Sequence, residues 1–280
     1  MSNPKVLITG GDGQLATDLR CVFPAATVVS RAALDITDRD AVREAVEALR
    51  PQVIINAAAF TAVDACETEV DAAHAVNSLG PAYLVAAAES VEARVVQIST
   101  DYVFDGGLAR PYHEWDTPNP MSSYGRSKYG GELAMRRCDL VVRTSWLCGP
   151  HGNNILKTIV GLARRGTEMN FVDDQVGHPS FTPDVAEVIG RLVEAEAHGV
   201  FHVTNQGAVS WYQFVREILE VLGRDPDQVS AIATAELDPP RPAPRPANSV
   251  LDNMGLRLWG LRGAPDFRES LGAVVDRIAD

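Results

Sequence analysis

Three residues of this chain could together protonate a ketone oxygen: Thr100, Tyr124 and Lys128. Tyr124 and Lys128 are four positions apart, so on a helix they share one face. The ammonium of Lys128 can then lower the pKa of the Tyr124 phenol, which makes the phenol a proton donor and acceptor near neutral pH. Thr100 ends an apolar run that begins at Arg94, and its hydroxyl can reach the same carbonyl oxygen. The set predicts reduction of a carbonyl group, with a hydride arriving at the carbon.

A glycine-rich turn near the N-terminus supports this interpretation. A Tyr-x-x-x-Lys pair by itself occurs by chance in many helices, where the ring packs and the amine is solvated. Here, however, residues 5–16 have the pattern of a buried strand, a glycine turn and a helix start. Gly10 and Gly13 allow a tight turn and the close approach of a pyrophosphate to the helix N-terminus. The spacing is G-x-x-G-x-x-A instead of the usual G-x-G-x-x-G.

Short apolar strands alternate with helical patterns in the first half of the chain, which is typical of a doubly wound parallel sheet. Asp38 is the expected N-cap of the second helix. A strand at 200–203 is expected to return to the main sheet. The other expected strands cover 6–9, 27–29, 53–56, 94–99 and 140–143, and the expected helices cover 14–22, 39–49, 70–91, 123–137, 155–165 and 182–197.

Length and composition indicate a globular α/β protein. The chain has 280 residues, of which 46% are hydrophobic and 22% are charged, enough for a sizeable core. We expect a Rossmann-like nucleotide-binding domain at 1–148, rejoined by about 181–208, and a smaller lobe at 149–280 that mainly binds substrate. The segment 238–246 is rich in proline and excludes a helix or a central strand. It is either a disordered linker or an ordered loop.

Charge and cysteine content exclude several classes of partner. The net charge of −12 argues against binding to nucleic acid or to an anionic membrane. No run approaches the ~18 apolar residues of a spanning helix, and the first apolar run is a strand and not a signal peptide. The four cysteines lack metal-ligand spacing, so we expect no metal motif and reduced thiols. These features together predict a cytoplasmic protein.

Nearly the whole chain resembles the dTDP-4-dehydrorhamnose reductases, a family of extended short-chain dehydrogenases/reductases. The last three of the matching motifs lie in the substrate-facing half and are far more specific than the fold signature. The family match also favours an ordered loop at the proline-rich segment. The matching segments are 10–15, 34–38, 56–64, 76–77, 99–106, 143–146, 174–179 and 245–252.

The resemblance implies reduction of the C4 ketone of a dTDP-4-keto-6-deoxy sugar, with dTDP-4-dehydro-L-rhamnose as the favoured substrate. Thr100 would polarise the carbonyl and Tyr124 would protonate the alkoxide, while Lys128 tunes Tyr124 and binds the nicotinamide ribose. Two alternatives remain: a sibling 4-ketoreductase of another deoxysugar pathway, and a non-catalytic regulatory subunit of the same fold. The complete catalytic set argues against the regulatory subunit. A homodimer and a requirement for Mg²⁺ remain open.

The same resemblance implies a site for NADPH or NADH. NAD-specific sites usually place an acidic residue after the second strand, whereas this chain has Ser30 and Arg31, which suit a 2′-phosphate. NADPH is therefore slightly favoured, although a solvated arginine is an equal alternative. The cofactor-binding residues implied are Gly10, Gly13, Gln14, Leu15, Ser30, Arg31, Asp35, Ile36, Ala59, Thr61, Tyr124 and Lys128.

On the substrate side, the resemblance implies that Thr100, Asp101 and Trp146 contact the sugar. Arg245 is suited to hold the diphosphate, although arginines among prolines are more often solvated. Related 4,6-dehydratases carry Thr-Asp-Glu where this chain has Tyr102 after Asp101, so elimination of water is disfavoured. Departures from the family pattern leave the exact sugar open; they are Tyr129, Cys148 and His178.

Overall fold

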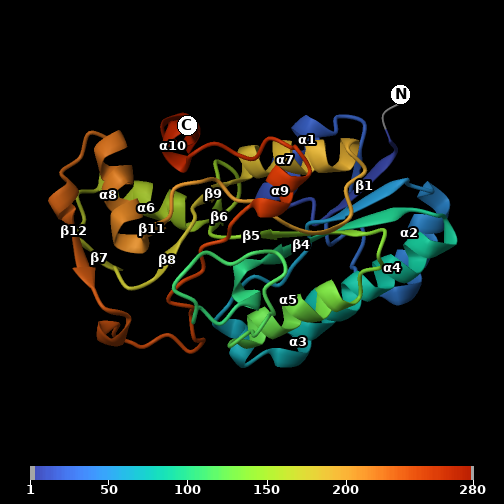
Figure 1. Cartoon of the computed structure of the whole chain (residues 1–280), viewed down its shortest axis with the longest axis horizontal. Helices are drawn as coiled ribbons and strands as arrows, with labels where there is room; N and C mark the ends of the chain where they lie inside the picture. The colour runs from blue at the N-terminus through green and yellow to red at the C-terminus, as the bar shows by residue number, and fades with distance from the viewer. Residues whose placement is uncertain (1–3, 279–280) are drawn as a thin grey trace.

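A six-stranded parallel sheet forms the larger part of the molecule, as the computed structural model of residues 4–278 shows (Figure 1). The strand order is β10-β5-β4-β3-β1-β2, and every pairing in this sheet is parallel. The doubly wound α/β class is thus confirmed, and the strand expected at 200–203 does return to the sheet. The strands are β1 (Val6–Thr9), β2 (Thr27–Val28), β3 (Val53–Asn56), β4 (Arg94–Thr100), β5 (Leu140–Thr144) and β10 (Gly199–His202).

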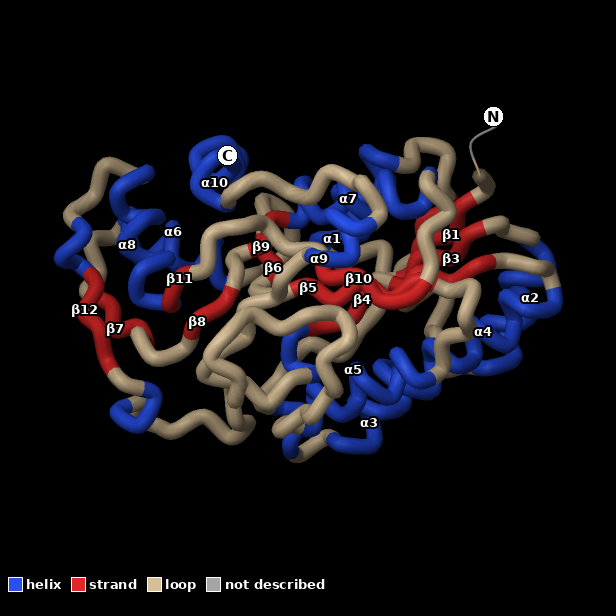
Figure 2. Tube along the Cα trace, viewed as in Figure 1, coloured by secondary structure: helices blue, strands red, loops and turns tan. Residues whose placement is uncertain are grey.

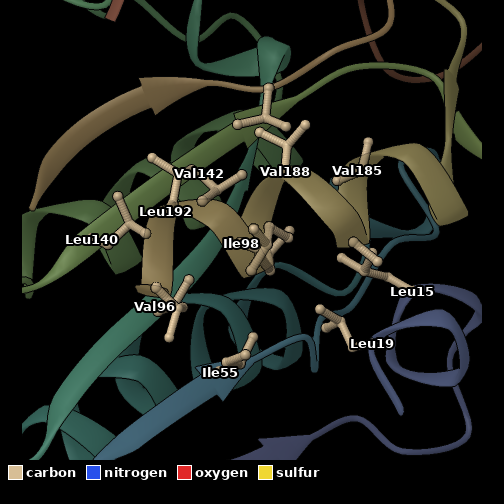
Figure 3. Packing of buried hydrophobic residues seen from close by; sticks show 14 of the residues in the cluster. Leu15, Leu19, Ile55, Val96, Ile98, Leu140, Val142, Val185, Val188 and Leu192 are labelled. Atoms are coloured by element: carbon tan, nitrogen blue, oxygen red, sulfur yellow. The ribbon is translucent and has the colours of Figure 1, made fainter. Parts of the chain in front are cut away.

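Helices cover both faces of this sheet (Figure 1). On one face lie α1 (Gln14–Val22) and α7 (Thr182–Glu194), which contact each other; on the other lie α2 (Arg39–Leu49), α4 (Gly80–Ser90) and α5 (Ser123–Leu133). Apolar side chains at helical spacing bind the first pair to the strands. Figure 3 shows these contacts, which join Leu15, Leu19, Val185, Val188 and Leu192 to Ile55, Val96, Ile98, Leu140 and Val142. Full burial of each such side chain contributes about 1.5–3 kcal/mol.

Local sequence signals set several helix boundaries. Asp38 caps α2 as predicted, because its carboxylate accepts hydrogen bonds from the amides of Asp40 and Ala41. Ser122 caps α5 by accepting from the amide of Gly125. The helix expected over 70–91 is divided by a π-helical turn at Ala75–Leu79, which lies between α3 (Val70–His74) and α4. Such a turn often marks a functional position, and Asn77 lies within it.

The second lobe has a core of its own, left of the sheet in Figure 1. Three helices carry it: α6 (Ile155–Arg164), α8 (Trp211–Val221) and α10 (Phe267–Ile278). Small strand pairs complete the lobe, namely β7 (Met169–Val172) with β12 (Val229–Ile232), β8 (Val176–Gly177) with β11 (Val209–Ser210), and β6 (Leu147–Cys148) with β9 (Ser180–Phe181). The domain boundaries themselves stay a prediction.

The chain between β12 and α9 (Met254–Leu258) is mostly loop (Figure 2). This part contains the proline-rich segment, which is an ordered loop, in agreement with one of the two expectations. The amide of Ala243 donates to the Asp64 carboxylate, and Ala243 is buried. The loop therefore returns from the second lobe to the region after β3. Among residues 4–278, no helix combines the length and apolarity needed to cross a bilayer.

Candidate active site

A cavity of about 560 Å³ opens at the carboxyl ends of β1, β3, β4 and β5. Ligands of doubly wound sheets bind at this edge. The structure brings Thr100, Tyr124 and Lys128 together in its wall, as predicted from their types and spacing. Other residues expected from the sequence also line it: Gly13, Gln14, Leu15, Ala59, Thr61, Asp101 and Trp146.

A second cavity of about 200 Å³ shares the wall residues Asp12, Gly13 and Ala57–Ala59 with the first. It is lined by the remaining expected cofactor residues Gly10, Arg31, Asp35 and Ile36, together with the apolar side chains of Leu34 and Val76. Ser30 and Arg245 line neither cavity. The carbonyl of Ser30 instead accepts hydrogen bonds from the amides of Ala33 and Leu34 and closes the turn after β2.

The turn between β1 and α1 fits a pyrophosphate. Gly10 has a φ of +72°, and a Cβ at this position would lie 2.6 Å from the amide nitrogen of Ala58. Glycine is therefore required where the chain passes the end of β3. Gly13 is the N-cap of α1, and no side chain of the described residues caps that helix. The amides of the first turn thus remain available for an anion.

At the far end of the second cavity, Arg31 and Asp35 form a loose, exposed pair. The Arg31 Nε donates to Asp35 Oδ2 over 3.2 Å, and the two side chains are 77% and 37% exposed. The pKa of Asp35 is lowered mainly by hydrogen bonds from the amide and hydroxyl of Thr37, with Arg31 a smaller cause. Because an exposed pair of this kind contributes little, Arg31 can leave Asp35 for a phosphate at small cost.

Tyr124 and Lys128 lie on the buried face of α5, but they do not interact as the sequence suggested. Burial raises the pKa of Tyr124, and the hydrogen bond with Thr100 only partly opposes this effect. The ammonium of Lys128 donates to the carbonyl of Ile98 over 2.5 Å. The expectation that Lys128 lowers the phenol pKa is therefore wrong for this geometry, because burial of the phenol dominates.

Burial also changes the titration of Lys128 itself. Desolvation lowers the pKa of Lys128 to about 8, and the negative charge of Glu132 acts against this fall. Near neutral pH the amine is thus still mostly charged. Asn77 does not contact the amine; its side chain donates to the Ser127 hydroxyl and to the carbonyl of Phe60. It supports α5 and the loop after β3 from the π-helical turn.

Asp101 lies in the wall of the cavity and is almost completely buried. Its Oδ1 accepts a hydrogen bond from the Thr100 hydroxyl over 2.9 Å, whereas its buried Oδ2 has no partner among the described residues. Burial raises the pKa of Asp101 to about 6, although hydrogen bonds from Ser249 and Thr100 oppose the rise. Buried polar atoms nearly always have a partner, so an unpartnered Oδ2 in the cavity wall marks Asp101 as a candidate ligand contact.

Trp146 stacks on Trp211 at the border between sheet and second lobe. The ring centroids are 3.8 Å apart at an angle of 11°, and both rings line the cavity. Trp146 has a φ of +43°, which is rare for a bulky residue. Gly177 makes room for it, since a Cβ there would lie 2.6 Å from the indole. The two lobes thus share one aromatic wall.

Trp211, together with Thr144 and Ser145, was missed by sequence reasoning although all three line the cavity. Thr144 ends β5 and could have been found from the rule that parallel strands end at the ligand edge. For Trp211 the sequence holds only a helix-start signal, the capping box between Ser210 and Gln213. That signal predicts where α8 begins, but it does not predict that Trp211 stacks on Trp146.

Comparison with known proteins places this geometry in a family. The model of the RmlD substrate binding domain matches residues 4–279. The chain belongs to this family. A dTDP-4-dehydrorhamnose reductase from Clostridium acetobutylicum has 40% sequence identity and a TM-score of 0.93, with 99% of this chain and 100% of that chain covered.

Two further members of the RmlD family are informative. The dTDP-4-dehydrorhamnose reductase of Bacillus anthracis was solved in complex with NADP; it is 34% identical, with a TM-score of 0.92 and coverage of 98% and 99%. The dTDP-4-keto-6-deoxy-D-glucose reductase of Streptomyces niveus is 40% identical over 91% of each chain.

Arg245 occupies a different place in this RmlD-family chain from the one expected. Its guanidinium makes two hydrogen bonds to the carboxylate of Asp64, at 2.5 and 2.7 Å, and its side chain is buried. It also interacts with the Tyr102 hydroxyl. Arg245 thus pairs with Asp64 and lines neither cavity, and its contact with a diphosphate stays a prediction. Arg245 instead anchors the proline-rich loop.

Tyr102 stands where a dehydratase would need a base. Its ring lines the cavity and meets the Tyr124 ring edge-on at 5.5 Å. Burial and the charge of Asp101 raise the pKa of Tyr102 to about 12, so the phenol does not act as a base at neutral pH. Residues 4–278 contain no group of three or more His, Cys, Asp or Glu side chains placed to hold a metal ion.

Proposed function

We propose that this chain reduces the C4 ketone of a dTDP-4-keto-6-deoxy sugar, converting dTDP-4-dehydro-L-rhamnose to dTDP-L-rhamnose. One observation carries the proposal: Thr100, Tyr124 and Lys128 line a single cavity beside a glycine turn that leaves a helix N-terminus free. The oxidoreductase activity agrees with the names of relatives that match over nearly the whole chain.

We propose that a nicotinamide cofactor occupies the two neighbouring cavities, which share wall residues. When bound, it supplies the hydride. Gly10, Gly13 and the first turn of α1 are suited to hold its pyrophosphate, and the apolar walls at Leu34 and Ile36 suit an adenine ring. Arg31 in the wall of the second cavity is proposed to bind a 2′-phosphate, which would favour NADPH over NADH. The further residues proposed to line the cofactor site are Gln14, Leu15, Asp35, Ala59, Thr61, Tyr124 and Lys128.

Tyr124 is the proposed proton donor. Its raised pKa keeps the phenol protonated throughout the physiological range, which suits a residue that must give a proton to a developing alkoxide. Thr100 offers a hydroxyl to the same oxygen. Lys128, whose ammonium donates to the carbonyl of Ile98, is proposed to bind the nicotinamide ribose.

The sugar is proposed to lie against the Trp146–Trp211 wall, next to Asp101. A sibling activity toward another dTDP-4-keto sugar is the second candidate, favoured by the Streptomyces niveus relative. A homodimer, a Mg²⁺ requirement and a cytoplasmic location stay predictions or open questions from the sequence.

Two substrates distinguish reduction from dehydration. With NADPH and a dTDP-4-keto-6-deoxy-L-sugar, the protein is expected to consume one cofactor per sugar. With dTDP-glucose and oxidised cofactor it should form no 4-keto-6-deoxy product, because Tyr102 replaces the base. Product analysis by mass spectrometry and the absorbance of NADPH measure both. Dehydration without net cofactor use would contradict the proposal, and a panel of dTDP and UDP 4-keto sugars separates the two candidates.

A further inference from the structure

A buried ion pair, Glu132 with Arg143, begins one helical turn after Lys128 on α5. Arg143 Nη2 is 2.7 Å from Glu132 Oε2, Arg143 Nε is 3.0 Å from Glu132 Oε1, and the two side chains are only 3% and 4% exposed. Removing two charges from water is costly, and an apolar pair of similar volume is often equally stable. Stability alone therefore gives little reason for charges at this place.

The pair connects all the elements that carry the catalytic groups. Glu132 lies four positions after Lys128 on α5, so the two side chains share a face. The Ser99 hydroxyl donates to Glu132 Oε1 over 2.5 Å, and Ser99 immediately precedes Thr100 on β4. Ser99 is paired in register with Arg143 on β5. A displacement of Glu132 would thus move both the lysine and the threonine.

The charge of Glu132 acts on Lys128 more than that of any other residue. Among charged groups, Glu132 is the one that raises the pKa of Lys128 against desolvation. The other titratable groups on α5 itself are Tyr124, Arg126 and Tyr129. Those on elements packed against α5 are Asp101 and Tyr102 after β4, Cys66 and Glu67 after β3, Asp71 and His74 on α3, Tyr83 and Glu89 on α4, and Arg94 on β4.

Arg143 supplies the positive countercharge to the buried Glu132 carboxylate. A lone carboxylate in a buried site tends to take up a proton. In this structure both oxygens of the Glu132 carboxylate accept hydrogen bonds from Arg143, and Oε1 also accepts one from Ser99. The ammonium of Lys128 is at the same time held by the carbonyl of Ile98. The hydrogen bond to Ile98 and the charge of Glu132 thus act on the same group, the amine of Lys128.

We propose that Glu132 and Arg143 are positioning residues, which hold a permanent negative charge one helical turn from Lys128 and so keep its amine charged and aligned. This inference rests on the role given to Lys128 in the proposed function. Neither residue is expected to touch the substrate or the cofactor.

The test is a direct titration of Lys128 in the protein. The chain has three lysines, Lys5, Lys128 and Lys157, so a spectrum of protein labelled with ¹³Cε-lysine is simple, and Lys128→Arg assigns the signal. Glu132→Gln/Arg143→Met removes both charges without leaving one of them unpaired. The titration midpoint of Lys128 is expected to fall by about one pH unit or more.

A matched control uses the ion pair at the other end of β4. Arg136 Nη2 is 2.8 Å from the buried Asp139 Oδ1, which also accepts from the amide of Val95. Arg136→Met/Asp139→Asn should lower stability and leave the Lys128 midpoint unchanged. Arg143→Lys keeps a cation beside Glu132 and should restore most of the wild-type midpoint.

Activity gives a second readout. In Glu132→Gln/Arg143→Met the alkaline limb of kcat/KM should move to lower pH together with the Lys128 midpoint. An unchanged midpoint in a folded double variant overturns the inference. If the double variant does not fold, Glu132→Gln alone is titrated, with the same expected direction; if neither folds, the pair acts in stability and the inference is wrong. Absence of reductase activity in the wild-type protein would instead contradict the proposed function.

Discussion

The two ends of the ligand cleft differ in how far their charges are removed from water. At the catalytic end Lys128 and Asp101 are buried, and burial lowers the pKa of Lys128 to about 8 and raises the pKa of Asp101 to about 6. At the opposite end Arg31 and Asp35 are exposed, and hydrogen bonds from Thr37 are the main cause that lowers the pKa of Asp35.

This difference separates chemistry from selectivity. Two charges interact several times more strongly in a buried site than in water, so a change at the catalytic end alters protonation itself. An exposed pair contributes about 0–1 kcal/mol, which lets Arg31 exchange its partner freely. Substitutions at the buried end should therefore change turnover, and those at the exposed end should change only the choice of cofactor.

The largest effect is expected for Tyr124→Phe. The change removes the phenol hydroxyl but little volume, so the fold should persist. Turnover should fall about 10²- to 10⁴-fold, as is typical when a general acid is lost. Stopped-flow NADPH oxidation measures the rate, and fluorescence titration should show nearly unchanged cofactor affinity. Near-normal turnover would contradict the assignment of Tyr124.

Asp101→Asn tests whether the buried carboxylate acts in its charged form. The pKa of about 6 means that Asp101 takes up a proton as the pH falls through 6. Sugar affinity in the wild type should therefore weaken below pH 6, whereas the variant should show no such acidic limb. At pH 7.5 kcat/KM should drop about 10- to 100-fold, the value of a hydrogen bond to a charged group. An acidic limb that persists in the variant would assign it to another group.

Arg31→Ala should change the cofactor preference and little else. If Arg31 binds a 2′-phosphate, NADPH binding should weaken about tenfold or more, while NADH binding stays almost the same. Isothermal titration with both cofactors measures the difference, and thermal stability should be unaffected because the side chain is exposed. Equal losses for the two cofactors would return Arg31 to the role of a solvated surface residue.

The smallest effect is expected at the aromatic wall. Trp211→Ala removes the stack on Trp146, and aromatic pairs contribute about 0.5–1.5 kcal/mol beyond burial. KM for the sugar should rise a few-fold with little change in NADPH binding, whereas Trp211→Phe should retain most of the affinity. Unchanged KM in Trp211→Ala would show that the second lobe does not contact the sugar through this ring.

The sequence alone was sufficient for features set by local interactions. The spacing of apolar residues and the capping signals predicted α1 and α2 at the observed bounds, with Asp38 as the cap of α2. The glycine spacing predicted the turn at Gly10. These depend on neighbours within a few positions. The presence of Thr100 at the cavity also followed, because the ends of parallel strands meet at one edge.

Only the tertiary structure decided what surrounds each charge. The guanidinium of Arg245 is chemically suited to bind a phosphate. In the structure it pairs instead with Asp64, which is far away in the sequence and lies outside the cavity. Lys128 was expected to lower the phenol pKa, yet burial raises it and the amine bonds to Ile98. Trp211 reaches Trp146 only because the second lobe packs there. Desolvation and long-range pairing depend on the whole packed molecule, whereas sequence spacing reports only the nearest neighbours along the chain.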